Sequence, residues 1–284
     1  MKEGLETVPP FMSAAMRFIL AIVLLFALLY QQKQRLPKDA SYWRLVGEAG
    51  VLMYGLPFAL IYWGQQKIPS GLSAVLFATY PFFVAIVGRT RLREDRLDAG
   101  KVLGVLLGFT GVYFVFSGEL AFDSTLSPLG MGAIVLSALM QAYGLISIRK
   151  RGENVHPVAL TLGGMLFGLL FLLAATIAGE SFEGVVFGWK AILSVVYLAL
   201  FGTVITFVTY FWLVKHIHPI LLALTAFVTP MIALTLGAFV RGERLVPELL
   251  WGASLVLLGV LVANSVGLRN LLRDRQNQRQ DVVP

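Results

Sequence analysis

Nine runs of nonpolar residues constrain this chain more than any other feature of its sequence. A helix needs about 20 nonpolar residues to cross the hydrocarbon core of a bilayer, where backbone amides and carbonyls must be paired within the protein. The sequence therefore predicts an all-α, polytopic membrane helical bundle with nine transmembrane helices, surrounded by the lipid bilayer. The runs lie near 10–30, 44–64, 70–88, 99–118, 128–148, 157–178, 191–213, 219–240 and 247–266.

Composition excludes several other classes of protein. Of the 284 residues, 57% are hydrophobic and only 14% are charged, which is too little polar material to cover a soluble globule of this size. The sequence contains no cysteine, which excludes disulfides, thiolate catalysis and thiolate metal sites. The basic residues lie between the nonpolar runs and form no separate basic domain, so we expect no nucleic-acid partner.

A duplicated sequence pattern divides the chain into two related modules. Pro81 is followed 13 residues later by Glu94, and Pro230 is followed 13 residues later by Glu243, so a shift of 149 residues relates the two copies. Internal repeats in a nonpolar chain are typical of secondary transporters, in which two related bundles move about a shared central site. We expect a first, incomplete repeat with four spans, a second repeat with five spans and a basic tail, at 1–127, 128–268 and 269–284.

The charges of the loops predict the orientation of the chain. Of the 23 Lys and Arg residues, 17 fall in loops on one side of the predicted membrane, together with the C-terminus. By the positive-inside rule this side is cytoplasmic, which places the N-terminus outside. Because a five-span module is preceded by only four spans, we expect the chain as written to lack its true first span. Translation of the upstream DNA should then add a nonpolar run of about 20 residues.

Three segments resemble a known family. The stretch IPSGLSAVLFATYPFF at 68–83, followed by REDRL at 93–97, resembles the fourth-span signature of the EamA-type branch of the drug/metabolite transporter superfamily. Residues 198–213 and 229–245 are similar to the eighth and ninth spans of that family. The resemblance implies ten helices in two inverted five-helix repeats, a substrate cavity between the repeats and a location in the cytoplasmic (inner) membrane. The chain departs from the family by lacking the first span, and by Gln141, which stands where the sixth span usually has an aromatic residue.

Polar and aromatic side chains within the runs indicate a binding site, because polar groups are costly against lipid and tend to face the interior of a bundle. Residues three or four apart share one face of a helix, as do Thr203, Thr206 and Tyr210 on the seventh run and Tyr54, Phe58 and Tyr62 on the second. An alternative is that these hydroxyls bond to helix carbonyls or anchor the chain at the membrane surface. The predicted substrate-binding residues are Tyr54, Tyr80, Gln141, Thr203, Thr206, Tyr210 and Thr229. Tyr80 and Thr229 are expected to face one cavity from opposite repeats.

The two repeated prolines are candidates for gating. Proline has no N–H, so Pro81 and Pro230 should each leave the carbonyl oxygen four residues earlier without its helical partner and kink the helix. Packing alone is the alternative explanation. Gly100, Gly104 and Gly108 form a ridge of small residues that lets another helix approach closely. We expect this ridge to serve helix packing, and a homodimer through glycine-rich helices is a further expectation.

Few charged or metal-binding side chains lie within the runs. Arg17 is expected to bond backbone carbonyls or to pair with an acid in an outer loop, with a functional role as the alternative. Glu48 lies near the cytoplasmic end of its run and is a poor candidate for a proton carrier, so we expect uncoupled or weakly coupled transport. His216 and His218 have no third ligand nearby, so we expect no metal site and no cofactor.

The sequence therefore favours a secondary transporter that exports small metabolites, amino-acid-like or amphipathic compounds by alternating access. No GxSxG, HExxH, Walker A or dinucleotide-binding motif occurs in a suitable context, so we expect no enzyme. Three alternatives stay open: a membrane scaffold or assembly protein without transport, a truncated and inactive transporter, and a lipid-modifying membrane enzyme. Saturable substrate flux in proteoliposomes would separate a transporter from a scaffold.

Overall fold

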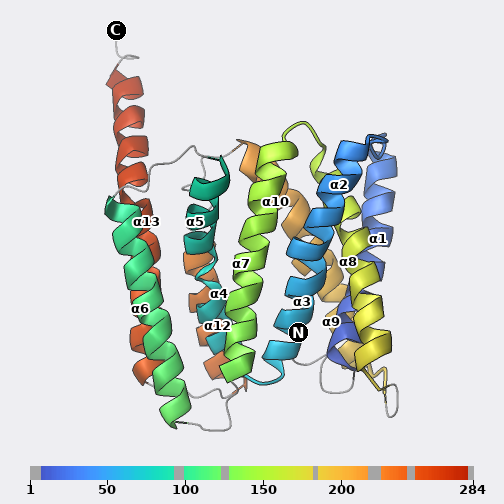
Figure 1. Cartoon of the computed structure of the whole chain (residues 1–284), viewed down its shortest axis with the longest axis horizontal. Helices are drawn as coiled ribbons and strands as arrows, with labels where there is room; N and C mark the ends of the chain where they lie inside the picture. Colours follow the sequence, from blue (N-terminus) through green and yellow to red (C-terminus); the bar gives the residue numbers. More distant parts are fainter. Residues whose placement is uncertain are drawn as a thin grey trace.

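The protein is a bundle of long, roughly antiparallel helices (Figure 1). The computed structural model describes residues 8–92, 99–122, 128–181, 185–216, 225–241 and 247–280. Glu94, Glu243 and His218 lie outside these residues. The elements are α1 (Pro10–Gln31), α2 (Ala40–Ala49), the π-helical segment η2 (Gly50–Gly55), α3 (Leu56–Gln65), α4 (Ser70–Phe77), α5 (Tyr80–Leu92), α6 (Ala99–Phe122), α7 (Pro128–Arg151), α8 (Pro157–Gly179), α9 (Trp189–Ala199), the π-helical segment η3 (Leu200–Ile205), α10 (Thr206–His216), α12 (Thr225–Arg241) and α13 (Pro247–Gln280).

These elements form nine rods within the described residues, and the rods coincide with the nine nonpolar runs. Two rods contain a π-helical segment: α2, η2 and α3 follow one another without a break, as do α9, η3 and α10. Six rods are long and nonpolar enough to cross a membrane, while α6 and α13 each contain a shorter nonpolar stretch. The prediction of an all-α, polytopic membrane bundle is therefore confirmed.

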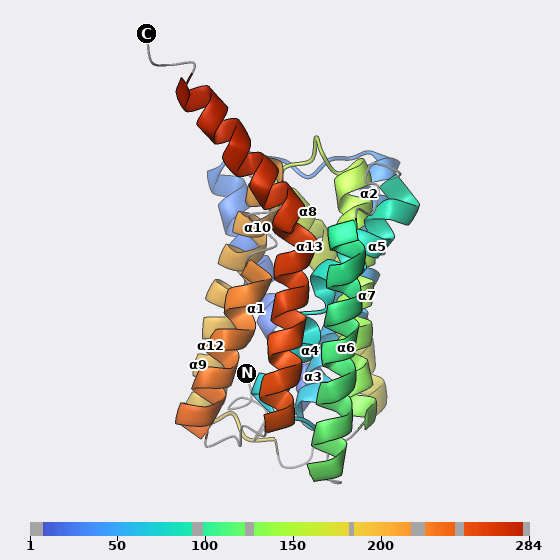
Figure 2. The same ribbon diagram turned by 90° about the vertical axis from the view of Figure 1, so that its left-hand side faces the viewer.

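Successive rods run in opposite directions, so their ends gather at two faces of the bundle. In Figure 1, α1, α5, α7 and α10 end at the face where α13 leaves the bundle, and α3, α6 and α8 end at the opposite face. Basic residues end two of the helices at the first face, with Arg89 and Arg91 on α5 and residues 149–151 on α7. The predicted tail continues as helix from α13 to Gln280 and extends beyond the other helices (Figures 1 and 2).

Proline and side-chain caps explain where several helices begin. Proline suits the first position of a helix, because its fixed φ is helical and its missing N–H would have no partner there. A side chain caps α8, where the Val158 amide donates to Nδ1 of His156 at 3.3 Å. The helices that begin at a proline are α1, α7, α8 and α13, at Pro10, Pro128, Pro157 and Pro247.

A second side-chain cap joins the two halves of the chain at one face of the bundle. The carboxylate of Glu180, just after α8, accepts hydrogen bonds from the amides of Phe11 and Met12 at 2.5 and 2.8 Å. A carboxylate at a helix N-terminus pairs orphan amides and opposes the positive end of the helix dipole. Burial raises the pKa of the Glu180 carboxyl above its ordinary value, and the two amide bonds act in the opposite direction.

The glycines of α6 and α13 bring the last helices of the two halves into backbone contact (Figure 2). A β-carbon added to Gly104 would lie 2.4 Å from the carbonyl oxygen of Gly259, and one added to Gly111 would lie 2.6 Å from that of Gly252. The packing role predicted for the ridge is thus seen at Gly104, although the sequence did not identify α13 as the partner. The space beside these glycines is already occupied by the facing helix of the same chain. A homodimer would therefore need other faces of α6 and α13.

Large nonpolar side chains cover the outside of the bundle. Helices α6 and α9 expose residues such as Leu106, Tyr113, Leu193 and Tyr197, and α13 exposes Trp251. In water so many exposed nonpolar side chains would cause aggregation, whereas lipid chains cover them at no cost. The interior contains one large cluster of buried side chains, mainly from α1, α2, α3 and α8, and another from α4, α6, α7 and α13. Helix α5 touches both clusters, because Phe82 belongs to the second and Tyr80 and Val84 pack against the first.

Candidate functional site

The centre of the bundle contains a connected row of aromatic rings. Phe77 on α4 stacks on Tyr80 on α5, with ring centroids 5.8 Å apart. On α10, Tyr210 contacts Phe211 at 5.9 Å, and Phe211 contacts Phe207 at 6.3 Å. Rings of the first half complete the row, since Tyr54 lies 4.9 Å and Phe58 6.2 Å from Phe207. Face and edge contacts of this kind stabilise the row and leave a surface suited to flat or nonpolar ligands.

Tyr80 and Tyr210 join the two halves of the chain within this row. Their hydroxyl oxygens are 3.4 Å apart, and either hydroxyl could be the donor. Both side chains are only partly buried, although they lie between the helices and not on the outer surface. Tyr80 also packs against two separate hydrophobic clusters. The predicted residues Tyr80 and Tyr210 are therefore brought together, at a place where aromatic surface remains uncovered.

The two π-helical segments lie at corresponding places in the two halves, 150 residues apart. A π-helical turn holds an extra residue, and such turns are frequent at functional sites. Here η2 fits closely against α8: a β-carbon added to Gly50 would lie 2.3 Å from Cβ of Phe167. The segments carry Tyr54 and Thr203, which the 149-residue shift makes equivalent. Both of these predicted site residues are completely buried.

The second π segment separates two threonines that the sequence predicted on one face. The hydroxyl of Thr203 is buried and donates to the Leu198 carbonyl at 2.9 Å. The hydroxyl of Thr206 donates to the Phe201 carbonyl at 2.6 Å, and this side chain is exposed. The expectation of a shared face assumed an unbroken α-helix, so it is wrong here, because the wider π turn changes the direction of the side chains that follow. The bond of Thr206 to its own helix matches the alternative that the sequence left open.

Gln141 and Thr229 lie in different surroundings. Gln141 on α7 is 7% exposed, beside Ala138 and Ala142, which pack against Phe83. No hydrogen bond joins its amide to the described residues. Thr229 on α12 is exposed. The shared cavity expected for Tyr80 and Thr229 stays a prediction, as do their roles in binding.

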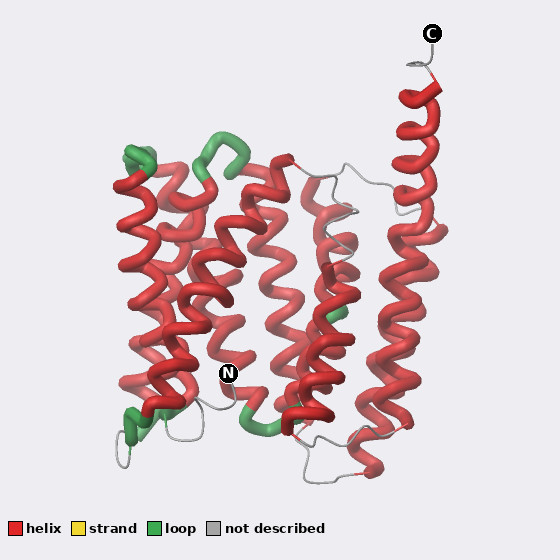
Figure 3. Tube along the Cα trace, turned by 180° about the vertical axis from the view of Figure 1, so that it is seen from behind, coloured by secondary structure: helices red, strands yellow, loops and turns green. Residues whose placement is uncertain are grey.

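The two prolines have different effects on their helices. At Pro81 the rod is interrupted: α4 ends at Phe77, a turn occupies Ala78 and Thr79, and α5 begins at Tyr80. Figure 3 shows this turn as a short loop inside the bundle. Pro230 instead lies within the unbroken helix α12. The prediction of a helix distortion is confirmed at Pro81, and the structure records no matching interruption at Pro230. Gating by either proline stays a prediction.

Arg17 on α1 connects the same two halves near the second π segment. Its Nε donates to Oγ1 of Thr203 at 2.6 Å, and one terminal nitrogen donates to the Gly202 carbonyl at 2.7 Å. The other terminal nitrogen lies 3.4 Å from the Tyr62 hydroxyl, and the guanidinium lies 5.0 Å from the centre of the Phe58 ring. The expected bond to a backbone carbonyl is therefore confirmed.

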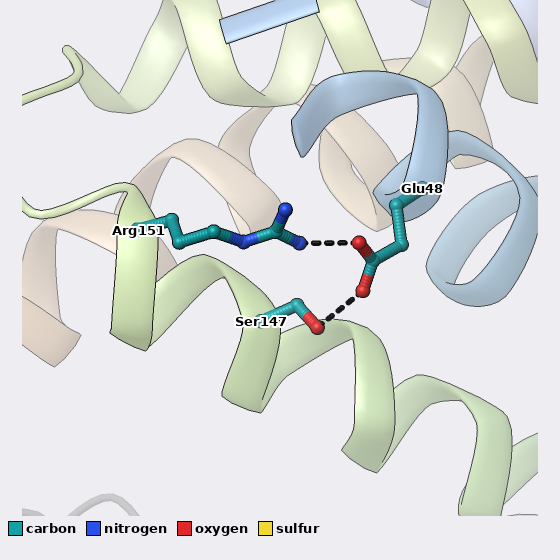
Figure 4. A network of polar contacts seen from close by, with 3 residues as sticks. All are labelled: Glu48, Ser147 and Arg151. Atoms are coloured by element: carbon teal, nitrogen blue, oxygen red, sulfur yellow. Dashed lines mark hydrogen bonds and ion pairs between the residues drawn. The ribbon is translucent and has the colours of Figure 1, made fainter. Parts of the chain in front are cut away.

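A polar cluster ties α2 to the end of α7 (Figure 4). The carboxylate of Glu48 accepts a hydrogen bond from the Ser147 hydroxyl at 2.5 Å and forms an ion pair with Arg151. The nearby Arg91 guanidinium stacks on Tyr143, 4.5 Å from the ring centre. Glu48 is thus engaged by a cation and a hydroxyl, in an arrangement that fastens two helices of different halves.

Sequence reasoning missed Phe207 and Phe211, which form the second-half side of the aromatic row. A signal for them was present, because the 149-residue shift relates Phe207 to Phe58 and Phe211 to Tyr62. Phe58 and Tyr62 had been placed on one face with Tyr54, and all three are buried. Applying the repeat to this aromatic face would have found both phenylalanines.

Known proteins are similar to this chain over nearly all its length. A family model described as "EamA-like transporter family" matches residues 1–117 and 128–265. The chain is 28% identical over 268 residues to "Uncharacterized inner membrane transporter YedA" of Escherichia coli K12, covering 93% of this chain and 84% of that protein. It is 23% identical over 263 residues to "Uncharacterized transporter YoaV" of Bacillus subtilis, covering 92% and 89%. A solved structure described only as "Crystal structure of protein" superposes with a TM-score of 0.69 at 19% identity, covering 93% of this chain and 91% of the other, which shows a shared fold.

Proposed function

Because this chain belongs to the EamA-like transporter family, we propose that it is a secondary transporter that exports small metabolites, amino-acid-like or amphipathic compounds by alternating access. The observation that carries this proposal is the contact between Tyr80 and Tyr210, where partly uncovered aromatic surface lies between the two halves of the chain. A site between two halves can open to one side of the membrane or the other when the halves rock. No cofactor or enzymatic step is needed for this activity.

The proposed substrate site combines flat nonpolar surface with a few polar groups. Tyr80 and Tyr210 supply aromatic surface and hydroxyls, and Phe77 extends that surface. Gln141, whose amide has no partner among the described residues, is proposed as a selectivity residue. Ligand sites are commonly of this kind, with nonpolar walls that bind and a small number of polar groups that orient. Such a site suits compounds that have both a nonpolar body and a polar group.

The proposed orientation places the C-terminus in the cytoplasm. The face where α5 and α7 end in Arg89, Arg91 and residues 149–151 would then be cytoplasmic, as the positive-inside rule requires. One relative carries the name of an inner membrane transporter, which supports the same membrane for this chain. In this orientation the Glu180 cap of α1 lies on the outer side.

Counterflow in proteoliposomes tests the proposed function. Purified protein would be reconstituted with unlabelled amino acids or amphipathic amines inside, and uptake of the labelled compound would be measured from outside. A transporter working by alternating access shows saturable uptake that is stimulated by the same compound on the far side. If no compound of either class is carried faster than in protein-free vesicles, the proposal is wrong.

Replacing Glu48 by glutamine is expected to leave counterflow within about twofold of the wild type. A proton carrier needs a titratable group near the middle of the membrane, whereas Glu48 is engaged by Arg151 and Ser147 near the end of α7. The measurement is counterflow with and without an imposed pH gradient. Ser147→Ala serves as a control that keeps the carboxylate. Accumulation driven by a pH gradient alone, and abolished in Glu48→Gln, would contradict the structural role of Glu48.

A further inference from the structure

Arg17 is a buried cation within a membrane span, and its described hydrogen bonds all go to neutral oxygens. The side chain is 6% exposed, and its acceptors are the Thr203 hydroxyl, the Gly202 carbonyl and the Tyr62 hydroxyl. Removing a guanidinium from water is costly unless an opposite charge and a full set of hydrogen bonds compensate it. Buried cations in membrane proteins therefore usually mark a partner anion or a ligand site.

The described part of the chain supplies no anion for this cation. Glu180 caps the N-terminus of α1, but its carboxylate accepts the amides of Phe11 and Met12, and no ion pair joins it to Arg17. The ring of Phe58 gives the guanidinium a cation–π contact at 5.0 Å. Such a contact is much weaker than an ion pair in a medium of low dielectric constant. The charge of Arg17 is thus only partly compensated.

The hydrogen bonds leave one end of the guanidinium weakly occupied. A guanidinium has five N–H donors, and the described hydrogen bonds of Arg17 take three of them. The bonds to Thr203 and Gly202 are 2.6 and 2.7 Å long, whereas the contact to Tyr62 is 3.4 Å. Charge-assisted bonds are normally about 2.7–2.9 Å long. Each terminal nitrogen therefore keeps one N–H without a described acceptor, and the nitrogen that faces Tyr62 makes the weaker contact of the two.

A second polar group with weak pairing lies in the same aromatic row. The hydroxyl of Tyr54 is completely buried and forms no hydrogen bond of ordinary geometry with the described residues. The Thr161 side chain interacts with it, but the Thr161 hydroxyl donates to the Pro157 carbonyl. Phe18 connects the two groups, because it contacts Phe58 at 5.1 Å and Tyr54 at 6.3 Å. A buried hydroxyl without a good hydrogen bond is unusual, because burying it unpaired costs more free energy than a typical hydrogen bond contributes. This hydroxyl is therefore a second polar group in the aromatic row that is available to a ligand.

We infer that Arg17 binds an anionic group of the transported compound, and that this group is a carboxylate. A planar carboxylate matches the fork of a guanidinium and accepts two parallel hydrogen bonds. Arg17 contacts Tyr62 and Phe58 of the first half and Gly202 and Thr203 of the second. An anion bound to Arg17 is therefore linked through this side chain to both halves of the chain. This inference rests on the proposed function and narrows its substrates to carboxylates, amino acids included.

Matched pairs of compounds test the inference on the wild-type protein. Counterflow would be measured for L-leucine and L-phenylalanine, for their uncharged N-acetyl amides, and for isoamylamine and phenethylamine, which lack the carboxylate. The expected result is at least tenfold faster uptake of each amino acid than of its amide and its amine. Equal or faster uptake of the amines or amides would overturn the role of Arg17 and leave the proposed transport function standing. Absence of uptake for all six compounds would overturn both the inference and the proposed function for these classes.

Three variants separate charge from structure. Arg17→Lys keeps the cation but not its fork, so the preference for carboxylates should persist with uptake reduced about tenfold. Arg17→Gln should remove the preference, and Tyr62→Phe should raise the KM for amino acids severalfold at nearly unchanged kcat. Arg89→Gln, at the exposed end of α5, is the control with a lost positive charge elsewhere. If Arg17→Gln does not fold, the comparison of compounds on the wild type and the Tyr62→Phe variant still test whether Arg17 binds the carboxylate. An undiminished carboxylate preference in Arg17→Gln, or an unchanged KM in Tyr62→Phe, would contradict the inference.

Discussion

Replacing Gly104 by alanine is expected to destabilise the protein by about 3 kcal/mol or more, at the upper end of what overpacking a core costs. The added β-carbon would lie 2.4 Å from the carbonyl oxygen of Gly259, 2.6 Å from Cβ of Ala263 and 2.7 Å from its backbone nitrogen. Two of these atoms are backbone atoms, so no change of side-chain rotamer relieves the contact and α6 must move away from α13. Thermal unfolding of the purified protein in detergent measures the effect.

Gly132→Ala is the matched control for this substitution. Gly132 lies in α7, and a β-carbon added there would meet nothing within 4 Å. The same change in helix propensity, which favours alanine over glycine, applies at both positions. Gly132→Ala should therefore leave the unfolding temperature unchanged or raise it slightly. Equal unfolding temperatures for Gly104→Ala and Gly132→Ala would contradict the backbone contact between α6 and α13.

Replacing Tyr80 or Tyr210 by alanine is expected to lower kcat/KM for transport about tenfold or more. Each change removes a ring that borders the proposed substrate site and one side of the hydroxyl contact between the two halves. A tenfold loss corresponds to about 1.4 kcal/mol, which is a typical value for one well-placed aromatic contact. Counterflow at several substrate concentrations gives kcat and KM for each variant.

Tyr113→Ala controls for the loss of a tyrosine elsewhere in the membrane. Tyr113 lies on α6 with 68% of its side chain exposed on the outer surface of the bundle. Its removal should reduce transport by less than twofold. Tyr80→Phe and Tyr210→Phe keep the rings and remove one hydroxyl each, so they should lose less activity than the alanine variants. Wild-type kinetics in both alanine variants would show that the substrate binds elsewhere.

Much of the fold followed from the sequence because the bilayer leaves few choices. Long nonpolar runs in lipid have to be helices, and the missing N–H of Pro81 predicted the distortion seen there, although Pro230 causes no matching interruption. Tyr54, Phe58 and Tyr62 were placed on one buried face by spacing alone, and all three are buried. These predictions depend on local rules, which one segment of sequence is enough to apply.

The remaining features depend on contacts between segments far apart in the chain. The glycine ridge on α6 required a close neighbour, but nothing local identified α13 as that neighbour. The π segments have no clear sequence signal, so Thr203 and Thr206 were assigned to one face and lie in different surroundings. Arg17 was expected to bond a carbonyl, yet the identity of that carbonyl as Gly202 depends on how α1 packs against η3. Tertiary packing decided each of these features.

A single cysteine at position 210 tests most directly the claim that one central site opens to each side of the membrane in turn. The chain contains no cysteine, so Tyr210→Cys is the only thiol in the protein. A membrane-impermeant thiol reagent would be applied to right-side-out vesicles and, separately, to inverted vesicles. Tyr113→Cys, on the lipid-facing surface, is the control that should stay unlabelled from both sides. Alternating access predicts that Tyr210→Cys is labelled from both sides. A cysteine that fails to react from one side or from both would contradict it.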